Sequence, residues 1–155
     1  MPATELPPID DLDRTGTIDL FTHPTAMTQD RPCSDQVEPS VGRTADELAS
    51  WLTTVPGLVT TEPTPITIGG RSGQMLDISL DPAWTGTCEG DPDTNPIVTY
   101  LNPGLAVRGD ERTRLILLDL GDGDVVAIGT WTRDRVAFDA FMPGAMPVIE
   151  SFTFE

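Results

Sequence analysis

Histidine and lysine chemistry is sharply limited in this chain of 155 residues. His23 is the only histidine, and lysine is absent. A metal site built on two or three histidines is therefore excluded, as is a lysine Schiff base. A Ser-His-Asp triad would need His23, but the sequence contains no G-x-S-x-G elbow, and the GRSG segment at 70–73 lacks its spacing. We expect His23 to be structural or solvent-exposed.

Two carboxylates interrupt otherwise apolar strands and could serve in acid–base chemistry. Asp77 lies within QMLDISL, and Asp119 lies within LILLDLG. If buried, such groups would have raised pKa values, and a carboxylate-based hydrolase would be a reasonable alternative function. On a half-buried sheet, both side chains would instead face solvent, which is the interpretation that we favour.

One polar loop carries alternating oxygen ligands of the kind that calcium prefers. Asp91, Asp93 and Asn95 have this spacing. An EF-hand loop would continue with glycine at its sixth position and glutamate at its twelfth, where this chain has Pro96 and Asn102. The DLGDGD segment at 119–124 forms a second acidic turn. Ordinary turns have the same composition, so a calcium-binding module remains an alternative.

Two arginines and two tryptophans are the candidate ligand-binding residues. Arg112 and Arg114 begin a strand in an otherwise acidic chain, and a guanidinium matches a carboxylate ligand. Trp84 and Trp131 could line a cleft, whereas Trp51 lies on a helical stripe and is expected in the core. Alternatively, the two arginines pair with acidic neighbours in the GDER segment. We predict no catalytic residue and no cofactor.

Charge restricts the partners that this chain can bind. Acidic residues outnumber basic ones by 25 to 9, which gives a net charge of −16. Such a field repels nucleic acid and anionic membrane surfaces. No run of apolar residues approaches the roughly 20 needed to cross a bilayer, so no direct membrane insertion is expected.

The two cysteines, Cys33 and Cys88, both lie in polar, turn-rich segments. This placement favours a disulfide over buried thiols, and the long loop that it closes corresponds to about 4 kcal/mol of stabilisation. A structural disulfide implies an oxidising compartment. The alternative is a pair of free thiols in a cytosolic protein.

The elements that must position these residues are short and rich in turns. Thr44 and Glu47 form a capping box that begins a helix, and its apolar stripe runs to Val55. Pro143 and Pro147 interrupt a C-terminal stripe, which predicts a short, kinked helix starting near residue 143. Strands are expected at 17–22, 58–61, 66–68, 74–80, 97–101, 112–120, 124–132 and 152–154, with turns at 69–73 and 121–123.

This order predicts an α+β fold, with an antiparallel β-sheet and two helices packed on it, one from the N-terminal half and one from the C-terminus. Residues 16–155 are expected to form a single domain. Residues 1–15 are rich in proline and acidic residues and are expected to be a flexible linker, with a signal peptide or anchor removed upstream.

Three segments resemble a recurring type of actinobacterial extracytoplasmic domain, found in lipoproteins or ectodomains. They are VEPSVGRTADELASWLTTVPGLVTTEPTPITIGGRSGQMLDISL, RTRLILLDLGDGDVVAIGTW and FDAFMPGAMPVIESFTF. Such domains look like distant relatives of the PsbP-like and LpqN-like α/β/α sandwiches. The resemblance implies that fold and a location outside the cytoplasm, secreted or membrane-anchored, and it transfers no site residues.

The combined expectation is a non-enzymatic domain for binding, sensing or protein interaction, displayed outside the membrane. Its partner would be a protein or a small molecule, and we expect a monomer. The carboxylate-based enzyme and the calcium-binding module remain the alternatives.

Overall fold

A computed structural model describes residues 16–31, 33–88 and 95–154. Its main sheet has the strand order β1-β9-β8-β5-β3, and β4 also pairs with β5. All pairings are antiparallel. The strands are β1 (Thr17–Thr22), β3 (Leu58–Thr60), β4 (Thr64–Ile68), β5 (Arg71–Leu80), β8 (Arg112–Gly121) and β9 (Asp124–Thr132).

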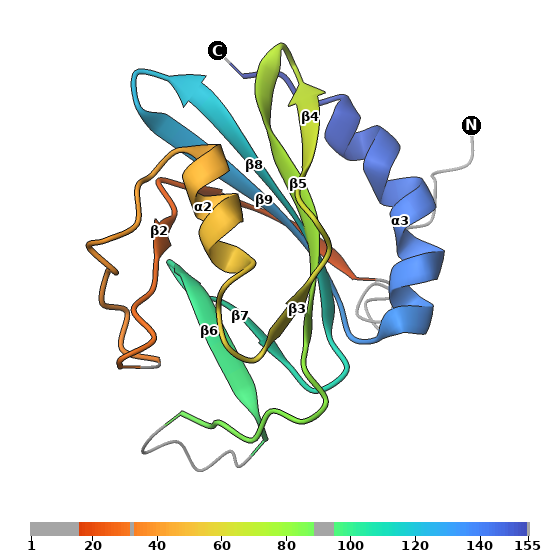
Figure 1. The fold of residues 1–155 in the computed structure, drawn as a ribbon. Coiled ribbons are helices and arrows are strands. Elements are labelled where there is room, and N and C mark those ends of the chain that lie inside the picture. Colours follow the sequence, from red (N-terminus) through yellow and green to blue (C-terminus); the bar gives the residue numbers. More distant parts are fainter. Residues whose placement is uncertain (1–15, 32, 89–94, 155) are drawn as a thin grey trace.

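The remaining elements cover the two faces of this sheet (Figure 1). Helix α3 (Arg135–Glu150) packs on one face. Helix α2 (Ala45–Leu52) and a smaller sheet lie on the other. The smaller sheet has the order β2-β6-β7, from β2 (Thr25–Ala26), β6 (Ile97–Asn102) and β7 (Leu105–Arg108). The predicted α+β class with antiparallel strands and two packed helices is confirmed.

Alternation along β5 and β8 builds a core on each face of the main sheet. Leu76 and Ile78 are buried in the cluster that includes α2, together with Leu115 and Leu117 of β8. Between them on β8, Ile116 points the other way and joins the cluster beneath α3. The sheet is therefore covered on both faces. Along a strand, alternate side chains point towards α2 and towards α3.

The N-terminus of α2 forms as its sequence predicts. Thr44 is the N-cap and accepts a hydrogen bond from the Glu47 backbone N–H at 3.1 Å, while its hydroxyl lies 2.8 Å from the Glu47 carboxylate. The helix ends at Leu52, so Val55 lies beyond it. Tight turns continue the chain there, with the Val55 N–H bonded to the Leu52 carbonyl. Val55 is nevertheless buried in the predicted core.

The prediction for the C-terminal helix is wrong in both position and length. Helix α3 begins eight residues before Pro143, because Asp134 caps it by accepting a hydrogen bond from the Ala137 N–H at 2.7 Å. Pro143 and Pro147 lie within it on its exposed side. Carbonyls that lose their donor on that side remain open to water, so burial of the opposite apolar stripe outweighs the missing bonds. The buried stripe comprises Ala137, Phe138, Met142, Ala145 and Ile149.

Other boundaries differ for local reasons. The turn between β4 and β5 is only Gly69-Gly70, both at positive φ, which allows β4 to begin at Thr64 and β5 at Arg71. The β8–β9 hairpin forms as predicted. Residues 152–154 form no strand, but Phe152 and Phe154 pack on the cluster beneath α3. Strands β2 and β7 were not predicted, since two- and four-residue strands leave little periodicity.

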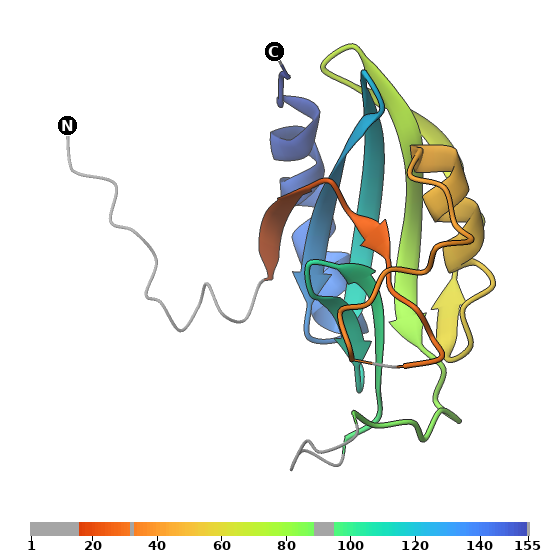
Figure 2. The same ribbon diagram turned by 90° about the vertical axis from the view of Figure 1, so that its left-hand side faces the viewer.

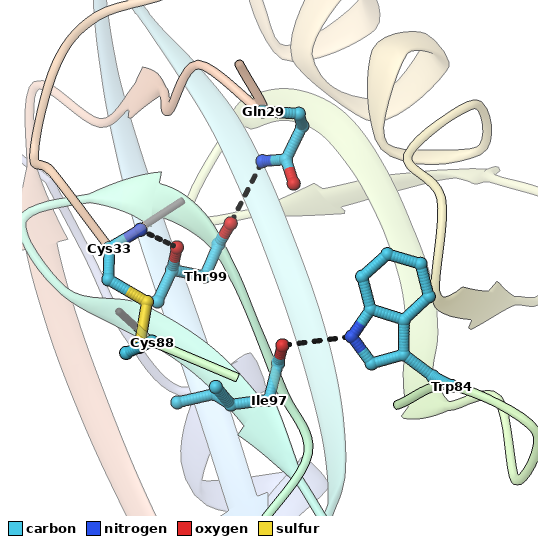
Figure 3. The surroundings of a disulfide bond; sticks show 6 residues. All are labelled: Gln29, Cys33, Trp84, Cys88, Ile97 and Thr99. Atoms are coloured by element: carbon cyan, nitrogen blue, oxygen red, sulfur yellow. Dashed lines mark hydrogen bonds between the residues drawn. A yellow bond between two sulfur atoms is a disulfide. The ribbon is translucent and has the colours of Figure 1, made fainter. Parts of the chain in front are cut away.

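The predicted disulfide is present and joins Cys33 to Cys88, with 5.7 Å between their Cα atoms. It connects the loop after β2 with the loop after β5, beside β6 (Figure 3). Two hydrogen bonds also attach this loop to β6: the Cys33 N–H donates to the Thr99 hydroxyl at 3.0 Å, and the Gln29 amide donates to the Thr99 carbonyl at 2.9 Å.

The predicted linker at 1–15 lies outside the described residues. Within the described ranges, no helix combines the length and the apolar character needed to cross a membrane.

Candidate functional site

The four predicted ligand-binding residues do not form one site. Trp84 packs against the core cluster beside α2, and its indole N–H donates to the Ile97 carbonyl at 3.0 Å (Figure 3). An added side-chain atom at Gly57 or Gly86 would fall within 2.8 Å of the indole. Trp84 therefore fixes the loop before Cys88 through its packing and its hydrogen bond to Ile97.

Arg114 is committed to a structural contact. Its guanidinium makes two parallel hydrogen bonds to Asp77, at 2.8 and 3.1 Å, across the β5–β8 pairing. The hydrogen bonds to Asp77 raise the Arg114 pKa, against the opposing effect of burial. The guanidinium also lies 5.4 Å from the centre of the Phe138 ring on α3. The pair thus attaches α3 to the sheet, and Arg114 is not available to a ligand.

Asp77 and Asp119 cannot act together, because they point to opposite faces of the sheet. Asp77 faces α3 and pairs with Arg114, whereas Asp119 accepts a hydrogen bond at 3.0 Å from the Ala45 N–H at the start of α2. Neither position matches the favoured expectation of a purely solvent-facing carboxylate. Both carboxylates are instead used to hold a helix.

Arg112 lines a hollow of about 550 Å³. Its polar rim mixes Arg112 and Arg135 with Asp110, Glu111 and Asp134. The opposite charges nearly cancel, so this hollow has no strong preference for an anion.

Trp131 lies on the other face of the sheet from Arg112 and Arg114. Its indole N–H donates to Glu111 at 2.8 Å, and the second oxygen of that carboxylate accepts from the Arg108 N–H at 2.9 Å. The ring lines a smaller hollow of about 220 Å³ that also contains Asp19 and Phe21 of β1. Glu111 therefore fixes the orientation of the Trp131 indole, whose ring borders this hollow.

The predicted metal ligands are only partly visible. Asp91 and Asp93 lie outside the described residues, and Asn95 lies at the start of the last described range. Among the described residues, no three histidine, cysteine or acidic side chains are grouped to hold a metal ion, including the turn at 119–124. His23 is exposed and lies 3.3 Å from Asp124, so the expectation of an exposed histidine is met.

The surface that the sequence did not predict lies along the edge of the main sheet (Figure 2). Within the described residues, β1 pairs only with β9, so its other edge is open. Leu20 on this strand is 50% exposed. The opposite edge of the sheet is blunted, because β3 has three residues and β4 carries Pro65. Short strands and proline are common protections against added strands, and β1 has neither.

An apolar groove of about 390 Å³ lies between this open strand and α3. Most of the groove residues on α3 have small side chains, which leaves the groove open along the helix. Val148, which also lines the groove, is 50% exposed. None of the described residues that line it is charged. They are Ile18 of β1 and Ala137, Ala140, Phe141, Gly144, Ala145 and Val148 of α3. An apolar groove beside an open strand can bind a segment through both backbone and side chains.

Comparison of the sequence with protein-family models gives no match, and comparison with the curated proteins gives none either.

Proposed function

We propose that this chain is an extracytoplasmic interaction domain that binds a segment of a partner protein along β1, in the groove beside α3. The observation that carries the proposal is the difference between the two sheet edges. One edge is interrupted by short strands and by Pro65, whereas β1 is a six-residue strand without proline, and its open edge lies next to an apolar groove.

The location outside the cytoplasm rests on the Cys33–Cys88 disulfide, because such bonds persist in oxidising compartments. The net charge of −16 supports a role away from nucleic acid. The layered arrangement of helices and sheet also agrees with the PsbP-like and LpqN-like sandwiches that the sequence resembles, and we propose a distant relationship to them. Protein isolated from its native compartment should gain about two hydrogens in mass on reduction.

The alternative of a carboxylate-based enzyme has no observation in its favour. The two carboxylates that suggested it lie on opposite faces of the sheet and each holds a helix. The calcium-binding alternative depends on Asp91 and Asp93 and remains a prediction from sequence.

A groove-blocking variant tests the proposed function. Gly144 lines the groove, and a Cβ atom added there meets no other atom within 4 Å, so Gly144→Trp should fold and fill the groove. The matched control is Asp139→Trp, on the exposed side of the same helix.

Peptides selected from a random library against the wild-type protein should bind Gly144→Trp at least about tenfold more weakly, because buried apolar contacts dominate such grooves. They should bind Asp139→Trp nearly as well as the wild type. Equal binding to all three proteins, or failure to select any peptide, would contradict the proposal.

A further inference from the structure

We infer that the segment bound at β1 is an extended strand in which apolar side chains facing α3 alternate with basic side chains facing Asp19 and Trp131. The inference rests on the proposed function and adds the chemistry of the partner. It follows from which backbone groups of β1 point outward, and from what lies on each face of the sheet beside them.

The hydrogen-bond phase of β1 follows from one contact at its end. The His23 N–H donates to the Val125 carbonyl at 3.1 Å, and the antiparallel register that pairs Thr22 with Val126 places these two residues opposite each other. In an antiparallel pair, positions bonded across the ladder alternate with positions that are not. Ile18, Leu20 and Thr22 therefore direct their N–H and C=O groups to the open side.

One face of an added strand would meet the groove. Residues directly opposite one another in a sheet project their side chains to the same face. Partner residues opposite Ile18 and Leu20 would thus lie on the α3 side, over Ala140 and Gly144. The apolar lining there selects valine, isoleucine or leucine at these alternate positions.

The other face of the added strand would meet a different environment. Asp19 lines the small hollow with Phe21 and Trp131, and it accepts a hydrogen bond from the Thr17 hydroxyl at 3.0 Å. Gly129, which pairs with Asp19, contributes no side chain and also lines this hollow. A carboxylate beside two aromatic rings is the chemistry that binds a guanidinium or ammonium group.

A second copy of this chain would fit the site poorly. Strand β1 has the sequence TIDLFT and contains no basic residue to place beside Asp19. Two copies would also each carry a net charge of −16. A basic segment is attracted by that charge, whereas another copy is repelled.

The probe is a fluorescein-labelled peptide, TRVRVRVT, titrated against the whole chain by fluorescence polarisation. Replacing its arginines by citrulline removes the charge but keeps the shape. The Asp19→Asn variant removes the complementary charge on the protein. Each single change should weaken binding by up to about fivefold, as for an exposed cross-strand ion pair, and the two changes together should cost less than the product of the single effects.

Two peptides with methylated backbone nitrogens test the strand geometry. Methylation at the valines, which lie opposite Ile18, Leu20 and Thr22, removes donors that face β1 and should abolish binding. Methylation at the arginines removes donors that face solvent and should leave binding nearly unchanged. Equal effects of the two peptides would overturn addition to β1.

The outcomes separate this inference from the proposed function. If the citrulline peptide binds as tightly as the arginine peptide and Asp19→Asn has no effect, while Gly144→Trp still abolishes binding, the basic preference is wrong and the proposed function stands. If neither peptide binds, but library-selected peptides of another composition do and depend on Gly144, the inference also fails alone. If no peptide depends on Gly144, both fail.

Discussion

Removing the Cys33–Cys88 bridge should destabilise the protein mainly by giving the unfolded chain more freedom. The bridge joins residues separated by 55 positions, and the chain-entropy relation for a loop of that length gives about 4 kcal/mol at 25 °C. The double variant Cys33→Ser/Cys88→Ser should therefore lose up to about 4 kcal/mol of unfolding free energy. For a chain of this size, the loss corresponds to roughly 8–16 °C in Tm.

The folded state of this variant should change little, because the loop has other attachments. The Cys33 N–H and the Gln29 side chain both bond to Thr99, and neither contact uses sulfur (Figure 3). Position 33 has a φ of 65°, and the energetic cost of this backbone conformation is similar for serine and cysteine. The loss should thus reflect the unfolded chain more than lost native contacts.

Urea unfolding followed by tryptophan fluorescence measures both parts of this prediction. The m-value should rise in the double variant, since an unfolded chain without the cross-link exposes more surface. Thr99→Val is the control for the local contacts, and should cost only about 0.5–1.5 kcal/mol with an unchanged m-value. A loss below about 1 kcal/mol in the double variant, or a loss without a rise in m, would refute the reasoning.

Four further measurements test other parts of the structure. Gly144→Ala should raise the unfolding free energy by about 0.5–1 kcal/mol in urea, since the added methyl meets no atom within 4 Å and alanine favours the helix; a loss would contradict the described helix. Pro147→Ala should add up to about 3 kcal/mol by restoring a backbone donor within α3, and no gain would argue that the helix ends earlier. Asp77→Asn should cost about 1–2 kcal/mol, and Arg114→Lys should not reproduce the wild-type stability, because lysine cannot donate two parallel bonds. Burial raises the pKa of Tyr100, the only tyrosine, in the folded protein. The buried neutral phenol therefore contributes fully to the unfolding free energy below about pH 10, and this contribution falls as the pH rises further. Tyrosinate absorbance should appear only with unfolding, and titration near pH 10 in the folded protein would contradict this.

Elements with a local signal could be predicted from the sequence. The capping box of Thr44 and Glu47 is complete within four residues, and the glycine-rich turn after β8 requires only its own backbone geometry. Helix α3 could not be placed correctly by the same kind of argument. Its prolines are a local signal against a helix, whereas the burial of Phe138 and Met142 that outweighs them depends on a sheet formed by distant strands.

The candidate site could not be predicted from the sequence for a related reason. The partners of Arg114 and Trp131 depend on how the strands are paired: Asp77 lies opposite Arg114 across β5 and β8, and Glu111, just before β8, reaches Trp131 on β9. The groove joins Ile18 to a helix more than a hundred residues later in the chain. Nothing in either segment alone indicates the other. The sequence signal that could have helped is the absence of proline from the six residues of β1.

The position of β1 also affects the order in which the fold closes. This strand is the first described element of the chain, yet its partner β9 lies roughly 110 residues later, so their pairing closes one of the longest loops in the molecule. Long-range pairings form late in folding, because the entropy of loop closure opposes them until other contacts exist. A strand with a neighbour on one side only is also among the first to open in the native state. Hydrogen exchange should therefore be fastest along β1 in the main sheet, and a bound segment would slow it most there, because it supplies the missing second neighbour.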